Sequence, residues 1–209
     1  MTYRWQLVTD MSASNHRCLE PSDICVYYRV KEKHVYGSFT ETNSIVTNFK
    51  KKPSICRSNQ RMTEYKEDGV RTITKDVLSL FSRKRSGRFL LVPAITSKAC
   101  DDVEYDNRLV RVCRAVSDKL DNVDCLDLLS VNESIASAHA GGSRSIDFIR
   151  SKIVVSPGYD LGGYDYVFIF DDVLTTGAHF KACQLELERE YGIRACGLFW
   201  AREETLEQL

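Results

Sequence analysis

Short, mostly apolar stretches alternate with segments of helical period from about residue 60 onward, and this alternation constrains the fold more than any other feature. The clearest apolar stretches are 88–94 (RFLLVPA), 164–170 (YDYVFIF) and 194–201 (RACGLFWA). Strands that are apolar on both faces belong to parallel sheets with helices packed on either side. The sequence therefore predicts an α/β fold built on a parallel sheet flanked by helices.

Helical spacing fills the gaps between these strands. Apolar residues recur at intervals of three and four over 65–81, 109–120 and 179–191, which predicts three helices. Weaker strand patterns occupy 123–130 and 151–156. The order of strands and helices is that of a chain crossing repeatedly from one parallel strand to the next.

The first part of the chain has a different pattern. Residues 24–30 and 34–40 are rich in aromatic and β-branched residues, and the short charged link between them predicts a β-hairpin. Residues 44–49 are a candidate third strand. We therefore expect a small β-rich N-terminal appendage over residues 1–58 and an α/β domain over residues 59–209.

Composition gives a few expectations about location and metals. No apolar run in the 209 residues is long enough to span a bilayer, and the first residues do not resemble a signal peptide, so we expect a cytoplasmic protein that does not bind membranes. The eight cysteines form no CxxC pair, which favours reduced thiols. A zinc site made of His16, Cys18, Cys25 and Cys56 stays an alternative, although this spacing matches no common metal module.

The net charge of zero hides an asymmetry along the chain. Residues 1–88 carry 17 Lys and Arg against 9 Asp and Glu, whereas residues 89–209 carry 12 against 20. A basic first half could bind phosphates or nucleic acid. Equally, the two halves could neutralise each other where they meet, and the sequence leaves both interpretations open.

Two adjacent carboxylates, Asp171 and Asp172, directly follow the apolar stretch 164–170, and a small-residue turn at 175–178 then precedes the helix predicted over 179–191. Ligands of open parallel sheets bind beyond the carboxyl ends of the strands. The first N–H groups of a helix have no partner within it and attract anions, above all phosphate. Carboxylates suit a divalent cation or the hydroxyls of a sugar. A phosphate site beside a diol site describes a ribose 5-phosphate.

The stretch VFIFDDVLTTGA, residues 167–178, resembles the motif with which type I phosphoribosyltransferases bind PRPP, 5-phosphoribosyl 1-pyrophosphate. The resemblance implies that Asp171 and Asp172 hold the ribose hydroxyls near Mg²⁺, which they bind directly or indirectly. It implies that the 5-phosphate is surrounded by Thr175, Thr176, Gly177, Ala178 and His179. It also implies a homodimer, because many members of the family dimerise.

Other segments fit the same family. By resemblance to it, the loop after the first predicted strand of the α/β domain would bind pyrophosphate through Thr96, Ser97, Lys98 and Ala99. Residues 65–81 and 105–109, with Ser143, Arg144 and Arg150, are similar to the ComF-like branch of the family. Residues 137–153 match a mobile loop that closes over PRPP and excludes water, as an oxocarbenium-like sugar requires. The resemblance makes Lys98 and Arg144 catalytic together with Asp171 and Asp172, and it makes the N-terminal appendage a hood over the site.

The sequence also departs from the family at specific positions. Thr175 stands where purine-salvage members carry an aspartate base, and a threonine cannot take a proton at neutral pH, which argues against a 6-oxopurine acceptor. His179 stands where a threonine is usual, and it could pair with the phosphate or point to solvent. Four acids between residues 101 and 106 would repel pyrophosphate unless Mg²⁺ intervenes or they point away.

Two hypotheses follow. The first is an enzyme that binds PRPP with Mg²⁺ and transfers ribose 5-phosphate to a nitrogen nucleophile with release of pyrophosphate. The second is a catalytically weak sensor of PRPP or nucleotides, or a module associated with nucleic acid. Basic residues that could contact a nucleic-acid backbone are Lys50–Lys52, Arg57, Arg61, Arg83–Arg85 and Arg88.

Overall fold

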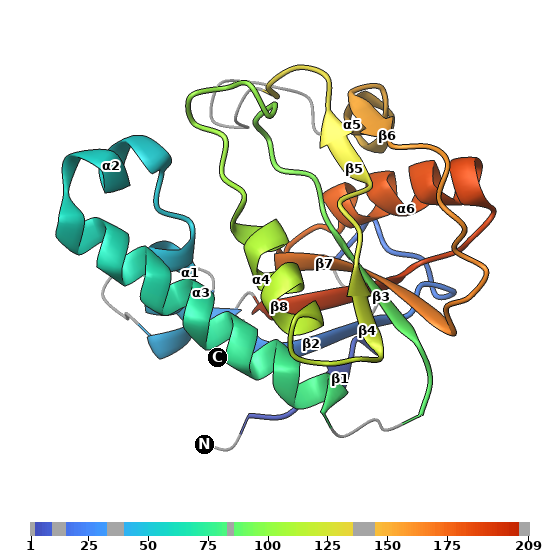
Figure 1. Ribbon diagram of the computed structural model, residues 1–209, viewed down its shortest axis with the longest axis horizontal. Coiled ribbons are helices and arrows are strands. Elements are labelled where there is room, and N and C mark those ends of the chain that lie inside the picture. The colour runs from blue at the N-terminus through green and yellow to red at the C-terminus, as the bar shows by residue number, and fades with distance from the viewer. Residues whose placement is uncertain (1–2, 10–15, 33–39, 83–85, 136–144, 205–209) are drawn as a thin grey trace.

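A six-stranded sheet of order β1-β2-β8-β7-β3-β4 forms the centre of the computed structural model, which describes residues 3–9, 16–32, 40–82, 86–135 and 145–204 (Figure 1). Every pairing in this sheet is parallel except that of β1 with β2. The strands are β1 (Gln6–Leu7), β2 (Cys25–Glu32), β3 (Phe89–Pro93), β4 (Val123–Cys125), β7 (Tyr166–Leu174) and β8 (Cys196–Glu204). The predicted α/β fold with a mostly parallel sheet is confirmed.

Helices cover both faces of this sheet (Figure 1). The helices are α1 (Glu41–Phe49), α2 (Pro53–Ser58), α3 (Gln60–Phe81), α4 (Arg108–Ser117), α5 (Ile146–Arg150) and α6 (Ala178–Tyr191). On one side α1, α2 and α4 pack against α3, and on the other α5 packs against α6. Strands β5 (Leu129–Val131) and β6 (Ile153–Val155) form a separate antiparallel pair. Within the described ranges no helix is long and apolar enough to cross a membrane.

The three predicted helices are confirmed, and their apolar stripes face the core. In α3 the buried apolar residues are Val70, Ile73, Val77 and Phe81. This helix begins earlier than its apolar pattern does, because the side chain of Asn59 accepts hydrogen bonds from the first N–H groups. The predicted strand 123–130 is two short strands, β4 and β5.

The N-terminal part corrects the sequence-based expectation. β2 pairs in parallel with β8, so it belongs to the main sheet and not to a separate β-rich appendage. The candidate strand 44–49 lies inside α1, where Thr40 caps the helix by accepting a hydrogen bond from the N–H of Asn43. The proposed partner strand, 34–40, lies outside the described residues except for Thr40.

α1 packs closely against α3 because Gly69 has no side chain. A Cβ on Gly69 would lie 3.0 Å from the backbone nitrogen of Phe49, and Phe49 itself is fully buried. Since Phe49 is the last residue of α1, this contact fixes the position of Lys50 directly after it. The N-terminal half thereby contributes a cation to the carboxyl end of the sheet.

The connections around β3 and β7 run in opposite directions. The chain passes from β3 through α4 to β4 on one side, and from β7 through α6 to β8 on the other. β7 pairs with β3 only as far as Phe170, and the residues 171–174 continue along β8 alone. A crevice therefore opens at the carboxyl ends of β3 and β7, where open α/β sheets bind their ligands.

Candidate functional site

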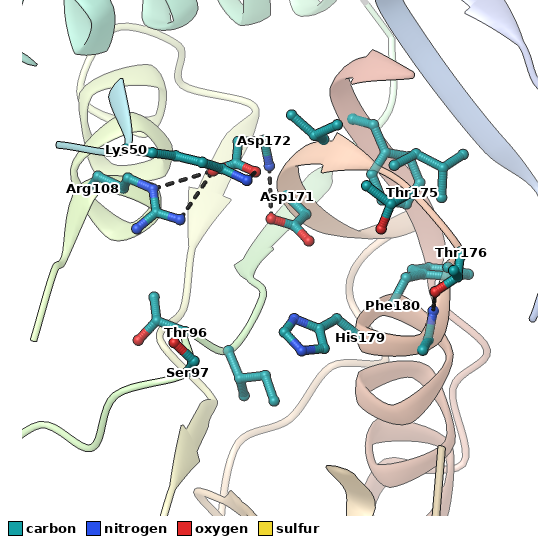
Figure 2. Close-up of a pocket in the computed structure, with 16 residues that line it drawn as sticks. Lys50, Thr96, Ser97, Arg108, Asp171, Asp172, Thr175, Thr176, His179 and Phe180 are labelled. Atoms are coloured by element: carbon teal, nitrogen blue, oxygen red, sulfur yellow. Dashed lines mark hydrogen bonds and ion pairs between the residues drawn. The ribbon is translucent and has the colours of Figure 1, made fainter. Parts of the chain in front are cut away.

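A cavity of about 250 Å³ occupies this crevice (Figure 2). The loop after β3 forms one wall, and the end of β7 with the turn into α6 forms the other. The predicted site residues that line it are Thr96, Ser97, Asp171, Asp172, Thr175, Thr176, Gly177, Ala178 and His179. The structure thus brings together most of the residues that the sequence singled out.

The two adjacent carboxylates point to opposite sides of β7, as consecutive strand residues do. Asp172 points toward the layer of α1 and α4, and its side chain is only 2% exposed. Its Oδ1 lies 2.8 Å from Nζ of Lys50, and its Oδ2 accepts hydrogen bonds of 3.0 and 3.2 Å from the guanidinium of Arg108. Both oxygens of Asp172 are therefore engaged with cations.

Asp171 points into the cavity (Figure 2). Among the described residues its one side-chain hydrogen bond is accepted by Oδ1 from the N–H of Asp172, at 2.8 Å. Its carboxylate lies on the side of α6, where its charge adds to the burial that raises the pKa of the Cys183 thiol to about 12. Asp171 is therefore the carboxylate of the pair that faces the cavity.

The pKa values of Asp171 and Asp172 are shifted in opposite directions. Burial raises the pKa of Asp171 to about 7, and the negative charge of Asp172 adds to this shift. Burial also opposes ionisation of Asp172, but the charges of Lys50 and Arg108 outweigh it and lower the pKa of Asp172. Asp172 is therefore a fixed anion, and Asp171 is a carboxyl group that titrates near neutrality.

The turn after β7 exposes the N-terminus of α6 to the cavity. Gly177 is the N-cap residue and has φ of 83°, a left-handed conformation that favours glycine. The hydroxyl of Thr176 accepts a hydrogen bond of 3.4 Å from the N–H of Ala178. His179 is half-buried and directs its ring into the cavity rather than out to solvent (Figure 2).

A segment near the N-terminus of the chain supports this turn from behind. Nδ1 of His16 donates a hydrogen bond to the carbonyl oxygen of Thr175. The N–H of Cys18 donates a hydrogen bond of 3.0 Å to the carbonyl oxygen of Thr176. His16 is 1% exposed. The backbone carbonyls of the turn thus point into the protein, which leaves its N–H side toward the cavity.

A buried ionic cluster ties the same segment to α6. Lys181 is 4% exposed and its Nζ lies 3.0 Å from both carboxylate oxygens of Asp23. Glu20 and Arg194 complete the cluster, with Arg194 bonded to Asp23 at 2.8 Å. The first turn of α6 is therefore held in place by charges from the N-terminal segment.

The sequence matches no family model and no curated protein. The geometry of the site and the chemistry of its residues therefore carry the functional argument.

The predicted pyrophosphate loop is divided between two neighbouring cavities. Lys98 does not line the first cavity; it lines a second one of about 270 Å³, with Nζ 3.0 Å from Asp102. Ala99 is buried, and its N–H donates to the hydroxyl of Ser134 at 3.2 Å. The second cavity shares four residues with the first, namely Lys50, Thr96, Ser97 and Arg108.

The predicted mobile loop is only partly described. Arg144, which we expected to be catalytic, lies outside the described residues, as do all residues from 136 to 144. Arg150 bonds Glu186 in α6 at 2.8 Å and does not line the cavity.

Three of the four acids that follow the predicted pyrophosphate loop have a cation partner among the described residues. Asp102 bonds Lys98 and the hydroxyl of Ser134. Asp106 accepts from Lys66 and Arg108, at 2.6 and 3.0 Å, and Glu104 lies 3.9 Å from Arg57. These three acids thus hold cations near the site.

Lys50 and Arg108 are the site residues that sequence reasoning missed. Arg108 lies 64 positions before Asp172 in the chain, and Lys50 lies farther away still. One signal was present in the sequence: a carboxylate beside a strand that is apolar on both faces needs a nearby cation. Which cation supplies the charge depends on the packing of α1 and α4.

Mg²⁺, which the resemblance implies, does not fit on Asp172. Mg²⁺ needs carboxylate oxygens at about 2.0–2.1 Å with further oxygen ligands around it, whereas both oxygens of Asp172 face cations. Asp171 alone keeps an oxygen directed into the cavity. The zinc alternative also finds no support, because the described residues contain no group of three or more His, Cys, Asp or Glu arranged to hold a metal.

The basic residues considered for nucleic acid do not share one surface within the described ranges. Lys50 lies at the carboxyl end of the sheet, whereas Arg88 precedes β3 at the opposite end and pairs with Asp124. Arg57 donates to the carbonyl oxygen of Val103, and Arg83–Arg85 lie outside the described residues. Binding of nucleic acid stays a prediction, as does a homodimer.

Proposed function

We propose that this chain is a phosphoribosyltransferase-like protein of type I fold and ComF-like kind, which binds PRPP and transfers its ribose 5-phosphate to a nitrogen nucleophile. One observation carries the proposal: a single cavity contains the carboxylate of Asp171 beside the N-terminus of α6. A carboxylate accepts hydrogen bonds from two hydroxyls, and a helix N-terminus binds phosphate. These are the two polar ends of a ribose 5-phosphate.

In this proposal the 5-phosphate binds at the turn before α6. The N–H groups of the turn and the positive end of the helix dipole attract it. The hydroxyls of Thr175 and Thr176 add donors, and Gly177 allows close approach of the backbone. His179 lines the same cavity and, when protonated, can pair with the phosphate.

The pyrophosphate of PRPP would occupy the second cavity. Its walls carry four cations, Lys50, Lys52, Lys98 and Arg108, against two carboxylates, Glu104 and Asp106. Pyrophosphate is strongly anionic, and charge-assisted hydrogen bonds from Lys and Arg stabilise it most once it has left the sugar. Mg²⁺ would arrive bound to the pyrophosphate of the ligand and not to Asp172.

The reaction needs no covalent intermediate on the protein. The bond between C1 of the ribose and the pyrophosphate oxygen breaks, and its electron pair leaves with the pyrophosphate. The lone pair of the acceptor nitrogen forms the new bond to C1, and the nitrogen releases its proton to water. Cations stabilise the leaving group while the ionised Asp171 faces the positive charge that develops on the sugar.

A binding protein without turnover is the second candidate. The pairing of Lys98 with Asp102 favours it, because a lysine held by a carboxylate stabilises a leaving pyrophosphate less. Such a protein would sense PRPP or a nucleotide through the same cavity.

Calorimetry tests the proposal. We expect PRPP to bind the wild-type chain and Asp171→Asn to abolish binding, whereas Asp68→Asn on the exposed side of α3 should bind normally. No binding of PRPP to the wild type would refute both candidates. Release of pyrophosphate with any member of a panel of nucleobases and amines would establish the enzyme, and binding without release would favour the sensor.

A further inference from the structure

The ion pairs around Asp172 belong to a chain of charges that carries surplus positive charge. Lys66 bonds Asp106 at 2.6 Å, Asp106 bonds Arg108 at 3.0 Å, Arg108 bonds Asp172 at 3.0 Å, and Asp172 bonds Lys50 at 2.8 Å. Three cations alternate with two carboxylates, so these five side chains carry a net charge of +1. Either the ionised carboxylate of Asp171 beside them or an anion placed at the end of the series balances this charge.

Lys50 is the accessible end of this series of charged side chains. The side chain of Lys50 is 42% exposed, whereas those of Arg108 and Asp172 are 16% and 2% exposed. Figure 2 shows Lys50 and Arg108 side by side on the wall of the cavity, both reaching Asp172. Lys50 also lines the adjoining cavity, so its ammonium group can contact an anion in either one while staying near Asp172.

A divalent metal at Asp172 would be repelled by these cations. Two positive charges already lie within about 3 Å of its oxygens. A metal ion would have to displace the ammonium group of Lys50, a residue whose backbone directly follows the packed contact of Phe49 with Gly69. The charges that a metal would otherwise supply are thus present in the side chains of Lys50 and Arg108.

We infer that Lys50 and Arg108 replace the divalent metal at this site, so that a ribose 5-phosphate ligand binds without Mg²⁺ and Lys50 contacts the sugar end of that ligand. This inference rests on the proposed function, since it concerns how the same ligand is held. It assigns to Lys50 a binding role that neither the motif at 167–178 nor the predicted loops contain.

The test uses ribose 5-phosphate and not PRPP, because the pyrophosphate of PRPP itself binds Mg²⁺. Calorimetry on the full chain compares buffer containing EDTA with buffer containing Mg²⁺. We expect the wild-type Kd to differ by less than about threefold between the two, since no protein ligand is left open for the metal at Asp172. Binding that appears only with Mg²⁺ would overturn the inference and leave the proposed function standing.

Substitution of Lys50 makes the test specific. Lys50→Ala should raise the Kd in EDTA by about tenfold, the effect of losing one charge-assisted hydrogen bond. Mg²⁺ should then restore part of the affinity, because Oδ1 of Asp172 becomes available to it. Lys75→Ala, on the outer side of α3, is the matched control and should bind as the wild type does.

Thermal unfolding and circular dichroism of both variants check that they are folded. An unchanged Kd in folded Lys50→Ala would overturn the inference. Absence of ribose 5-phosphate binding to the wild type in either buffer, together with absence of PRPP binding, would overturn the proposed function as well.

Discussion

Gly177 and Leu19 lie so close together that no side chain fits between them. A Cβ built on Gly177 would lie 2.7 Å from Cδ2 and 2.9 Å from Cγ of Leu19. The glycine also has φ of 83°. The turn that faces the cavity is therefore shaped by two separate requirements, a left-handed backbone and a contact with the N-terminal segment.

Gly177→Ala should therefore destabilise the protein for two separate reasons. The left-handed conformation costs an alanine about 1–2 kcal/mol, and overpacking against Leu19 adds about 1–3 kcal/mol. Urea unfolding measures the loss. Gly158→Ala is the matched control, because Gly158 has φ of 90° but no atom within 4 Å of the place that a Cβ would take. Equal losses in the two variants would show that the contact with Leu19 does not matter.

Asp171→Asn should make stability less dependent on pH. Because the pKa of Asp171 is raised to about 7 in the folded state, the folded chain binds a proton that the unfolded chain has lost between about pH 4 and pH 7. This group therefore lowers stability as pH rises through that window. Between pH 4 and pH 8 we expect the free energy of unfolding of the variant to rise by about 4 kcal/mol relative to that of the wild type, since the shift spans about three pKa units and each corresponds to about 1.4 kcal/mol.

Urea unfolding at several pH values checks this prediction. Asp68→Asn, at an exposed position of α3, is the control and should show no such gain. A variant whose stability falls in parallel with that of the wild type between pH 4 and pH 8 would contradict the assignment.

Lys181→Met should cost about 3 kcal/mol of stability, because it removes the buried cation of an ion pair and leaves its partner with Arg194 as the remaining cation. The other partner is Asp23, whose side chain is 0% exposed. Arg194→Gln removes a more exposed cation from the same cluster and should cost less. Chemical unfolding of the two variants compares them, and a larger loss for Arg194→Gln would mean that burial does not set the cost.

Lys98→Gln should weaken binding in the second cavity and leave binding in the first cavity unchanged. Lys98 lines the second cavity and not the first. We expect the Kd for PRPP to rise by about tenfold, as for one lost charge-assisted hydrogen bond, and the Kd for ribose 5-phosphate to stay the same. Calorimetry with both ligands measures this, with Lys119→Gln, at an exposed position just after α4, as the control. A parallel loss for both ligands would place Lys98 at the sugar.

The second half of the fold could be predicted because its signals are local. The buried residues of β3, β7 and β8 are consecutive in the chain, so each strand can be recognised from its own sequence. The turn into α6 was equally visible, since Gly177 and the threonines before it are next to the acids of β7. The residues of this turn and the two acids before it therefore line one cavity, as their closeness in the sequence indicates.

The N-terminal half could not be predicted in the same way. β2 has the composition of a hairpin strand, but it lies between β1 and β8, and β8 is some 170 positions away in the chain. Residues 44–49 are rich in β-branched side chains, yet Val46 and Phe49 are buried against α3 and the segment is helical. Tertiary packing outweighed local propensity in both places. Lys50 was missed for the same reason, since only the packing of α1 brings it to Asp172.

The support of the turn by His16 has a consequence for how the protein is made. His16 and Thr175 are 159 positions apart, and Lys181 and Asp23 are 158 apart. During synthesis these contacts of the N-terminal segment can form only after the ribosome has synthesised almost the whole chain. A nascent chain therefore lacks the cavity at the carboxyl ends of β3 and β7, and premature termination anywhere before β7 yields a product without it.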